Sequence, residues 1–445
     1  MSHIQPRIDL ATIRASAEPA TATITDVLGR IAADRNRAII EVNPDAQLLA
    51  EYAQTSPNPH PLAGIPIALK DNIDTGDRMQ TTAGSPALLT SRAHRDAFAI
   101  TQLRQSGAIP VAKANMSEWA NFRAAHSSSG YSGRGGQCLN PHDHTRCPSG
   151  SSSGSAAAVA AGLVPLAIGS ETDGSIISPS ARCGVVGIKP TVGVVPTKGV
   201  VPISASQDSP GPMTRSVADA AALLEVLGGL ENLVAQTQVQ SDLCIGVMRN
   251  YRTGHPGTDA LFDEVVEQLA GAGVSLCDVG VEVPNGTVSG DELTVLLCEL
   301  KDDLNAYLPM RGASGPQSIT DVLAHEQANA SIELAHFGHE FFVQAAASEG
   351  RAGAAYKEAR ARNLQWALEV CLEPAIAKCD VLIAASYAPA WKIDVTNGDQ
   401  GCDQRVRAHR AQCGAGHSGA SGLRAGARLH QRSGERQGQR AAVQA

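Results

Sequence analysis

The sequence predicts an α/β protein in which helices cover both faces of a sheet. Short apolar segments with the length of buried strands alternate with longer segments whose apolar residues recur at helical spacing. The composition, with 43% hydrophobic and 18% charged residues, is typical of a globular protein that can bury a sizeable core. With 445 residues the chain could form one large domain or several of average size.

The first elements are predicted from apolar periodicity. Residues 22–42 carry apolar side chains at near-helical spacing and predict an amphipathic helix. The run Ile65–Leu69 predicts a short buried strand that ends at Lys70. Residues 94–108 predict the next helix, and residues 109–112 predict the strand that follows it.

A second strand and helix are predicted around a serine-rich loop. The small-residue segment Ala156–Ala161 follows Ser155, which is a favoured N-cap residue type, so we expect a helix to begin there. Its N-terminal amides would then face the serines that precede it. Residues 163–168 predict a strand that leads into a turn over residues 171–175.

The second half of the chain has a different pattern. From about residue 257 to 375 the apolar spacing is mainly helical, and residues 379–385 predict one further strand. We expect one domain over residues 1–400, with its motifs densest at about 60–222 and with the helical region on the substrate side.

Residues 401–445 differ from the rest in composition. They contain eight arginines against Asp403 and Glu435, a net charge of +6 that leaves −14 on residues 1–400. Large aliphatic residues are few in this segment, so burial cannot offset the entropy cost of ordering it. The sequence therefore predicts a basic, disordered tail.

The net charge and the cysteine pattern indicate which binding partners and which cellular compartment to expect. A formal net charge of −8 argues against a general binder of nucleic acid or of anionic membranes. No apolar run reaches the roughly 18 residues that a membrane span needs. The ten cysteines include no C-x-x-C pair and match no zinc-ligand spacing. With no signal peptide in its first residues, the chain is predicted to be cytoplasmic, with free buried thiols.

Three separated segments carry the chemistry. Lys70 ends an apolar stretch, Ser151 stands in the Gly/Ser-rich run Ser149–Ser155, and Ser175 lies 24 residues after Ser151. A Gly/Ser-rich loop or a lysine after a strand is weak evidence alone, but type, order and spacing agree here. The combination resembles the amidase signature family of amide hydrolases. Further matching segments are residues 116–122, 183–191 and 207–219.

The resemblance implies an amidase signature fold, a layered α/β/α structure with a large twisted mixed sheet, and a Ser–cisSer–Lys triad. Ser175 would be the nucleophile, and Lys70 would be the ultimate base. Lysine accepts a proton only when neutral, so its pKa must fall from about 10.4 to near 7. Ser151 would bridge the two groups and pass the proton between them.

Further site residues are implied by the same resemblance. The peptide bond Gly150–Ser151 would be cis, and Ser152 would be a supporting hydrogen-bond partner. The resemblance also implies an oxyanion hole formed by four backbone amides. These amides belong to Thr172, Asp173, Gly174 and Ser175.

The finer resemblance is to the peptide amidase branch. Residues 117–123, 171–175 and 202–208 look like that branch, and Asp173 stands where the general family pattern carries Gly. The expected reaction is hydrolysis of a peptide C-terminal amide, or of a small amide, to carboxylate and ammonia through an acyl-enzyme. The expected partner is the amide substrate alone, without metal, nucleotide or prosthetic group, on a monomer or homodimer.

The resemblance ends at about residue 399. Family members continue with a small-residue segment, apolar strands and a final helix. In this chain the basic tail occupies that place. We therefore expect the C-terminal strands of the sheet to be missing, and the activity to be at risk. One alternative is a truncated, catalytically defective amidase-like protein. Another is the A subunit of a glutamine-hydrolysing amidotransferase.

A third alternative is a Ser–His–Asp hydrolase. Residues 150–154 fit the pattern G-x-S-x-G with Ser152 as nucleophile. That chemistry needs a histidine later in the chain, and none of those present stands in a telling sequence context. The available histidines after Ser152 include His255, His325, His336 and His339.

Overall fold

The computed structural model describes residues 8–16, 18–56, 58–237 and 243–401. The basic tail predicted over residues 401–445 lies, apart from its first residue, outside the described residues. Among the described residues no helix is long and apolar enough to cross a membrane.

The largest sheet has six strands in the order β1-β3-β2-β6-β8-β7. Strands β3, β2 and β6 run parallel, while β1 and β8 pair antiparallel with their neighbours, so the sheet is mixed. A second, parallel sheet has the order β10-β9-β11, and β4 pairs with β5 in a short hairpin. The strands are β1 Ile39–Val42, β2 Pro66–Lys70, β3 Ile109–Ala114, β4 Tyr131–Ser132, β5 Gly136–Gln137, β6 Leu166–Glu171, β7 Val186–Gly187, β8 Ser209–Thr214, β9 Cys244–Val247, β10 Ser275–Asp278 and β11 Val381–Ile383.

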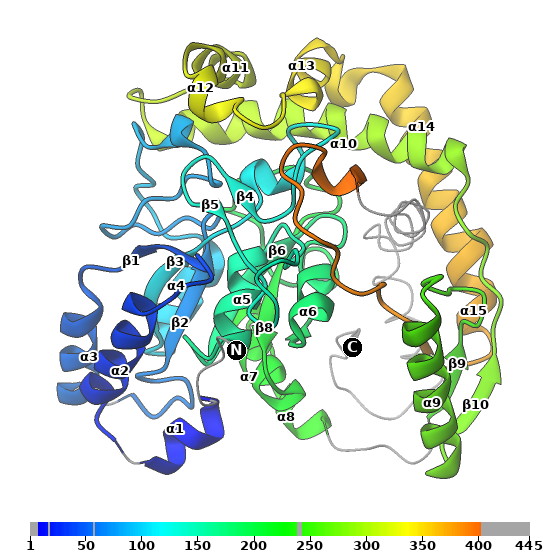
Figure 1. Cartoon of the computed structure of the whole chain (residues 1–445), viewed down its shortest axis with the longest axis horizontal. Coiled ribbons are helices and arrows are strands. Elements are labelled where there is room, and N and C mark those ends of the chain that lie inside the picture. Colours follow the sequence, from blue (N-terminus) through cyan, green and yellow to red (C-terminus); the bar gives the residue numbers. More distant parts are fainter. Residues whose placement is uncertain (1–7, 17, 57, 238–242, 402–445) are drawn as a thin grey trace.

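Helices surround these sheets, and the long helix α10 crosses one end of the molecule (Figure 1). The helices are α1 Leu10–Ser16, α2 Ala20–Ala32, α3 Ala46–Thr55, α4 Phe98–Gln105, α5 Ser153–Ala160, α6 Ile177–Cys183, α7 Val217–Gly228, α8 Leu233–Gln236, α9 Pro256–Gly271, α10 Gly286–Tyr307, α11 Ile319–Ala328, α12 Ala330–Glu333, α13 Glu340–Ala347, α14 Ala354–Gln365 and α15 Glu373–Ile376. A π-helical turn, Trp366–Leu372, joins α14 to α15.

The six-stranded sheet has a hydrophobic core on each face. Ile67 and Leu69 of β2 pack into the core that α4 and α7 share, whereas Ala68 packs into the core of α2, α3 and α5. This alternation is the two-residue period of a strand. It places Lys70 on the same face as Ala68, the face that α5 covers. The predicted α/β/α layering is confirmed by these two cores.

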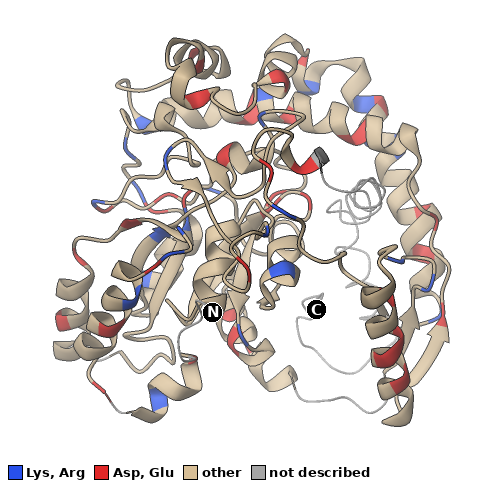
Figure 2. Ribbon diagram, viewed as in Figure 1, with Lys and Arg blue, Asp and Glu red and all other residues tan. Residues whose placement is uncertain are grey.

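The three-stranded sheet is also covered on both faces. Val247, Leu276 and Ile383 pack with α9, while Cys244, Cys277 and Leu382 pack with the helical stretch that contains Trp366 and Ala375. This unit lies at one side of the molecule in Figure 1, and acidic residues mark its helix α9 in Figure 2. The acidic residues of α9 are Asp259, Asp263, Glu264 and Glu267.

After β11 the chain returns across the main body. Trp391 accepts a hydrogen bond at 2.7 Å from the backbone of Cys147, and the Asp399 carboxylate accepts one at 3.0 Å from the backbone of Ser129. The segment between β11 and Gly401, drawn in orange in Figure 1, therefore lies against the loop that precedes α5. It closes one side of the site described below.

Two predictions of local structure need correction. The helix predicted over 22–42 ends at Ala32, because Ile39 and Ile40 belong to β1. The predicted N-cap Ser155 lies inside α5, which begins at Ser153; the cap position is Ser152. The region 257–375 is mainly helical, as predicted, and also contains the short strand β10.

One glycine shows how tightly the site-bearing helix packs. A Cβ on Gly154 of α5 would collide with the backbone of Ala38 and of Asn115. We predict that Gly154→Ala lowers the free energy of unfolding by about 1–3 kcal/mol or more, because backbone cannot yield as a side chain can. Urea denaturation would measure this loss.

The matched control is Gly29→Ala on α2, where a Cβ meets no atom of the described residues within 4 Å. That change should raise the free energy of unfolding by about 0.4–1 kcal/mol, because alanine restricts the unfolded chain. Equal effects of the two substitutions would contradict the packing described for α5.

Candidate active site

The candidate site lies where parallel strands end. Lys70 is the last residue of β2, and Glu171 is the last residue of the neighbouring strand β6. Because β2 and β6 are parallel, their carboxyl ends meet at one edge of the sheet. The loop that follows β3 reaches the same edge and holds the serine-rich loop: Ser117 donates its N–H to the carbonyl of Ser151 at 3.1 Å.

Lys70 is fully buried, and three oxygen atoms surround its amine. Its Nζ lies 2.8 Å from Ser151 Oγ, 2.9 Å from the Ser170 carbonyl and 2.9 Å from Ser170 Oγ. Burial lowers the pKa of Lys70 to about 7, and the negative charges of Asp208 and Glu171 oppose part of that shift. Near neutral pH the amine therefore exists in both the charged and the neutral form. The pKa that the family resemblance required is reached by burial in this structure.

The serine-rich loop is held rigidly beneath α5. The peptide bond Gly150–Ser151 is cis, as the resemblance implied. Ser152 donates from Oγ to the Ser170 carbonyl at 3.1 Å and accepts from the Ser170 N–H at 3.2 Å. A Cβ on Gly150 would collide with Ser117 Oγ, so a larger residue does not fit there. Ser152 thus links the serine-rich loop to Ser170, and Gly150 fits closely against Ser117.

Ser175 stands at the start of α6 in a turn fixed by Glu171. The Glu171 carboxylate accepts the backbone N–H groups of Ile176 at 2.7 Å and of Ile177 at 2.9 Å. The Ser175 carbonyl accepts the N–H of Ser152 at 3.1 Å, which joins this turn to the serine-rich loop. Ser175 is 7% exposed and lines a cavity.

Of the two predicted hydrogen bonds in the triad, one is present. Lys70 contacts Ser151, but among the described residues no hydrogen bond joins the hydroxyls of Ser151 and Ser175. A hydroxyl can rotate about its C–O bond, and contacts in a site often tighten only with substrate present. The arrangement therefore brings the three residues to one place, with a contact between Lys70 and Ser151 but none between Ser151 and Ser175 among the described residues.

The turn before Ser175 offers backbone donors. Among the described residues, the N–H groups of Gly174 and Ser175 donate no hydrogen bond. Gly174 has a φ of +73°, a conformation that favours glycine, and a Cβ there would lie 2.6 Å from Tyr387 Oη. Thr172 and Asp173 line the same cavity, so all four predicted oxyanion-hole residues border it.

Asp208 and Lys189 support this turn from behind. Thr172 Oγ1 donates to Asp208 at 2.6 Å, and Lys189 Nζ donates to the Thr172 carbonyl at 2.6 Å. Burial raises the pKa of Asp208 to about 6, against hydrogen bonds from Thr172 and from backbone amides that lower it. At neutral pH Asp208 is thus mainly a carboxylate, and its charge acts on Lys70.

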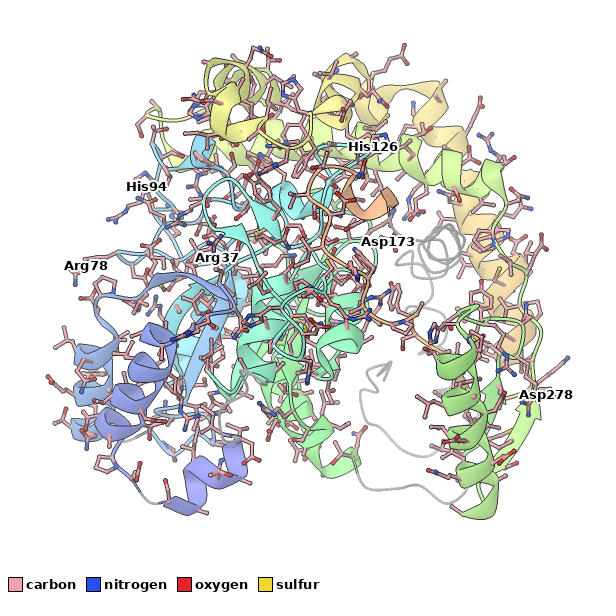
Figure 3. The ribbon with its side chains drawn as sticks, viewed as in Figure 1. Arg37, Arg78, His94, His126, Asp173 and Asp278 are labelled. Carbon is pink, nitrogen blue, oxygen red and sulfur yellow. The ribbon has the colours of Figure 1, made fainter. Side chains whose placement is uncertain are left out.

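The cavity has a volume of about 230 Å³ and mixed walls. Tyr387 and Trp391 come from the returning C-terminal segment, and Leu296 comes from α10. The Arg182 guanidinium lies 4.8 Å from the ring centroid of Tyr387 and 4.8 Å from that of Trp391. Figure 3 labels Asp173 in the central part of the molecule, near this segment. The lining residues are Ala120, Asn121, Phe122, Ser149, Gly150, Thr172, Asp173, Gly174, Ser175, Ser178, Arg182, Ile203, Leu296, Tyr387 and Trp391.

The cavity walls that distant segments form were not predicted from the sequence. Leu296, Tyr387 and Trp391 lie more than 100 residues from Ser175 and carry no recognisable motif. The motif at 117–123, by contrast, does contribute to the cavity. Its residues Ala120 and Asn121 form a tight turn, with φ values of 54° and 68°, and both line the cavity wall.

Three buried carboxylates lie beside that turn. Glu118, Glu326 and Glu333 lie close enough to share a metal ion. The guanidinium of Arg123 already stands among them, paired with Glu118 and lying 3.8 Å from Glu326 and 3.6 Å from Glu333. Burial raises the pKa of Glu118 well above its usual range. Arginine thus supplies the cation, and the cluster anchors the cavity wall to α11 and α12.

The histidines of the Ser–His–Asp alternative have other contacts. His339 pairs with Glu326 at 2.8 Å, His325 lies 3.8 Å from Glu333, and His255 caps α9. His336 packs edge-on against Tyr131. The structure therefore gives Ser152 none of these histidines as a base.

Burial of Lys70 predicts a characteristic dependence of stability on pH. Unfolded Lys70 keeps its proton up to about pH 10.4, whereas the folded state releases it above about 7. Between these values the unfolded state binds more protons, so the free energy of unfolding rises with pH. Relative to Lys70→Met, the native protein should gain up to about 1.4 kcal/mol per pH unit in this window. Urea denaturation of both proteins at several pH values would measure this gain. If the free energy of unfolding changed equally with pH in the native protein and in Lys70→Met, a neutral Lys70 would be contradicted.

Comparison with known proteins assigns the family. The family model described as Amidase matches residues 22–408. A probable amidase of Arabidopsis thaliana is 41% identical over 341 residues, which are 70% of this chain and 65% of that protein. The glutamyl-tRNA(Gln) amidotransferase of Deinococcus radiodurans has an A subunit that is 39% identical over 235 residues, 50% of this chain and 47% of that relative.

Among solved structures, the peptide amidase PAM in complex with the competitive inhibitor chymostatin has the same fold. It matches with a TM-score of 0.81 at 35% identity, over 97% of this chain and 99% of that one. The chain thus spans less than two thirds of the length of the two relatives above, and nearly all of the peptide amidase chain. The motifs, the mixed sheet and the matched family model agree: this chain belongs to the amidase signature family.

Proposed function

We propose that this chain is an amide hydrolase that converts a carboxamide to a carboxylate and ammonia through an acyl-enzyme on Ser175. The observation that carries the proposal is the buried Lys70 amine, with a pKa of about 7, at 2.8 Å from Ser151 Oγ. A buried lysine with so low a pKa suits a base far better than it suits a structural ion pair.

In the proposed reaction neutral Lys70 accepts the Ser151 proton while Ser151 accepts the proton of Ser175. The Ser175 oxygen attacks the amide carbonyl, and the N–H groups of Gly174 and Ser175 stabilise the oxyanion. The proton then returns through Ser151 to the leaving nitrogen, and ammonia departs. Water hydrolyses the ester by the same proton path, which restores the free carboxylate and the Ser175 hydroxyl.

The proposed substrate is the C-terminal carboxamide of a peptide, or a small amide. Similarity to peptide amidase PAM over almost the whole chain supports this class. A cavity of about 230 Å³, with Phe122, Tyr387 and Trp391 in its walls, has room for a primary amide and part of one adjoining residue. Action as a monomer or homodimer in the cytoplasm remains a prediction.

Two alternatives lead to different results in one assay. The A subunit of an amidotransferase would release ammonia from glutamine, and a defective amidase-like protein would release none from any amide. Because a relative of the first kind is 39% identical over half of this chain, glutamine belongs beside peptide amides in the first substrate panel.

We predict that a fluorophosphonate serine probe labels the native protein at Ser175 and that Ser175→Ala abolishes this labelling. Lys70→Ala should lower the labelling rate by roughly 10²–10⁴-fold, the usual contribution of a general base. Intact mass and peptide mapping would measure the adduct.

Ser180→Ala is the matched control, because Ser180 lies on the neighbouring helix α6, is buried and, among the described residues, has no hydrogen-bond partner for its hydroxyl. It should label like the native protein. A folded native protein that takes no probe would support the defective alternative.

The rate of amide hydrolysis should rise with pH through about 7 and then level off, because Lys70 must lose its proton to act. The pH profile of kcat/KM measures the pKa in the free enzyme. Exposed Lys357 gives a control: Lys357→Ala should leave the profile unchanged. A profile that is flat from pH 5 to 9 in the native enzyme would rule out Lys70 as the base.

A further inference from the structure

The segment that returns after β11 carries a buried carboxylate near its end. Asp399 is 5% exposed, and its carboxylate accepts the Ser129 hydroxyl at 2.5 Å and the Ser129 N–H at 3.0 Å. The N–H of Asp399 donates to the Ser127 carbonyl at 3.1 Å. Asp399 therefore binds the loop of residues 127–129 through both its carboxylate and its backbone, although 270 residues separate it from Ser129.

The residue before this carboxylate allows a close approach of the two chain segments. Gly398 has a φ of +64°, and a Cβ there would collide with the backbone carbonyl of His126. Glycine alone satisfies both requirements. Figure 3 labels His126 close to the orange end of the returning segment. The contact of Asp399 with the loop is thus prepared by the backbone on both sides.

The peptide unit between Ser129 and Gly130 connects this contact to the candidate active site. Its N–H, which belongs to Gly130, donates to Ser117 Oγ at 2.8 Å. The N–H of Ser117 in turn donates to the carbonyl of Ser151 at 3.1 Å. A continuous chain of hydrogen bonds and one peptide unit therefore runs from Asp399 to the residue that contacts Lys70.

A second route begins at the carbonyl of the same peptide unit. The Ser129 carbonyl accepts the Cys147 thiol at 3.3 Å, and Cys147 Sγ accepts the N–H of Ser149 at 3.3 Å. Ser149 lines the cavity, and its carbonyl accepts the Ser153 hydroxyl at 2.6 Å. Ser117, Cys147 and Ser149 are no more than 2% exposed. Because water does not compete with buried hydrogen bonds, both routes hold the serine-rich loop firmly.

The cavity wall on the returning segment has supports of its own. The Trp391 carbonyl accepts the Cys147 N–H at 2.7 Å, and the Ile393 N–H donates to the Thr145 carbonyl at 3.0 Å. Both contacts lie between the aromatic wall and Asp399 or within that wall. Loss of the Asp399 carboxylate should therefore act on the serine-rich loop more than on the wall.

We propose that Asp399 is a positioning residue for Ser151. Its carboxylate fixes the peptide unit Ser129–Gly130, and this unit holds the serine-rich loop where Ser151 contacts Lys70. Proton transfer needs heavy atoms about 2.6–3.2 Å apart, so a small displacement of Ser151 slows it. The effect on the reaction rests on the proposed function, whereas the effect on the loop does not.

The first test measures labelling of Ser175 by the fluorophosphonate probe over a range of probe concentrations. Asp399→Ala should lower the maximal labelling rate by up to roughly 10²-fold, the cost of a misplacement of about 1 Å. The probe concentration that gives half the maximal rate should change far less, because the wall keeps its supports. Asp399→Asn keeps an acceptor for the Ser129 N–H and should restore most of the rate.

A second variant tests the route itself. Ser117→Ala removes the acceptor of the Gly130 N–H and should also lower the maximal rate. Adding Asp399→Ala to Ser117→Ala should then cost less than Asp399→Ala costs alone, because both changes break one route. Ser117→Ala also decides the question if Asp399→Ala does not fold. In that case, labelling of Ser117→Ala at the native rate would overturn the proposal.

Hydrogen exchange followed by mass spectrometry tests the loop without any turnover. In Asp399→Ala the N–H groups of Ser117 and Gly130 should exchange roughly 10–100-fold faster, which corresponds to the loss of one hydrogen bond to a charged group. If the native protein takes no probe, the proposed function fails, and the exchange rates alone decide whether Asp399 positions the loop.

Asp394→Ala is the matched control. Asp394 lies on the same returning segment, and within the part of the chain that the structure describes its carboxylate accepts hydrogen bonds only from Thr396 and Asn397. This variant should match the native protein in labelling and in exchange. Native exchange rates in Asp399→Ala, or a change confined to the half-saturating probe concentration, would overturn the proposal.

Discussion

The site depends on the burial of one amine. Lys70 has no exposed surface, and the free energy of removing its charge from water lowers its pKa to about 7. The carboxylates of Asp208 and Glu171 act against this shift, so the pKa reflects a balance between burial and nearby negative charge. Both carboxylates also have structural tasks: Glu171 fixes the turn before α6, and Asp208 accepts from Thr172. The same residues that shape the site therefore also influence the pKa of the Lys70 amine.

The fold supplies this burial through the order of its strands. Lys70 ends a central strand of the six-stranded sheet, with β3 on one side and β6 on the other. The two-residue period of β2 turns the amine toward the face covered by α5, and the loop before α5 carries Ser151. The loop after β3 then holds the serine-rich loop through Ser117. A lysine on an edge strand would remain solvated and charged at neutral pH.

The sequence predicted the parts of the molecule whose signal is local. Lys70, Ser151 and Ser175 stand in short segments of defined type and order, and the cis bond at Gly150–Ser151 followed from the family resemblance. The structure brings these residues together, although among the described residues the hydrogen bond between Ser151 and Ser175 is absent. The N-terminal helix was overextended because Ile39 and Ile40 continue a helical spacing by chance, while their burial comes from pairing with β3.

Features formed by distant segments could not be predicted in this way. Tyr387 and Trp391 reach the cavity only because the chain returns over the loop before α5 after β11. The same holds for Cys244 and Cys277, which the register of β9 and β10 brings to one face. Glu118 and Arg123 lie in a motif that the sequence did reveal, but their partners Glu326 and Glu333 come from α11 and α12. The cavity wall, the cysteine positions and the carboxylate cluster all depend on tertiary contacts.

The central claim is that Lys70 is a neutral amine for much of the time at neutral pH. The most direct measurement is an NMR titration of the protein with ¹³C-labelled lysine side chains. The Lys70 signal would be assigned by its loss in Lys70→Met, which separates it from the other two buried lysines, Lys113 and Lys189. The account predicts a pKa of about 7 for this signal. A signal that titrates near the ordinary value of about 10.4 would contradict it.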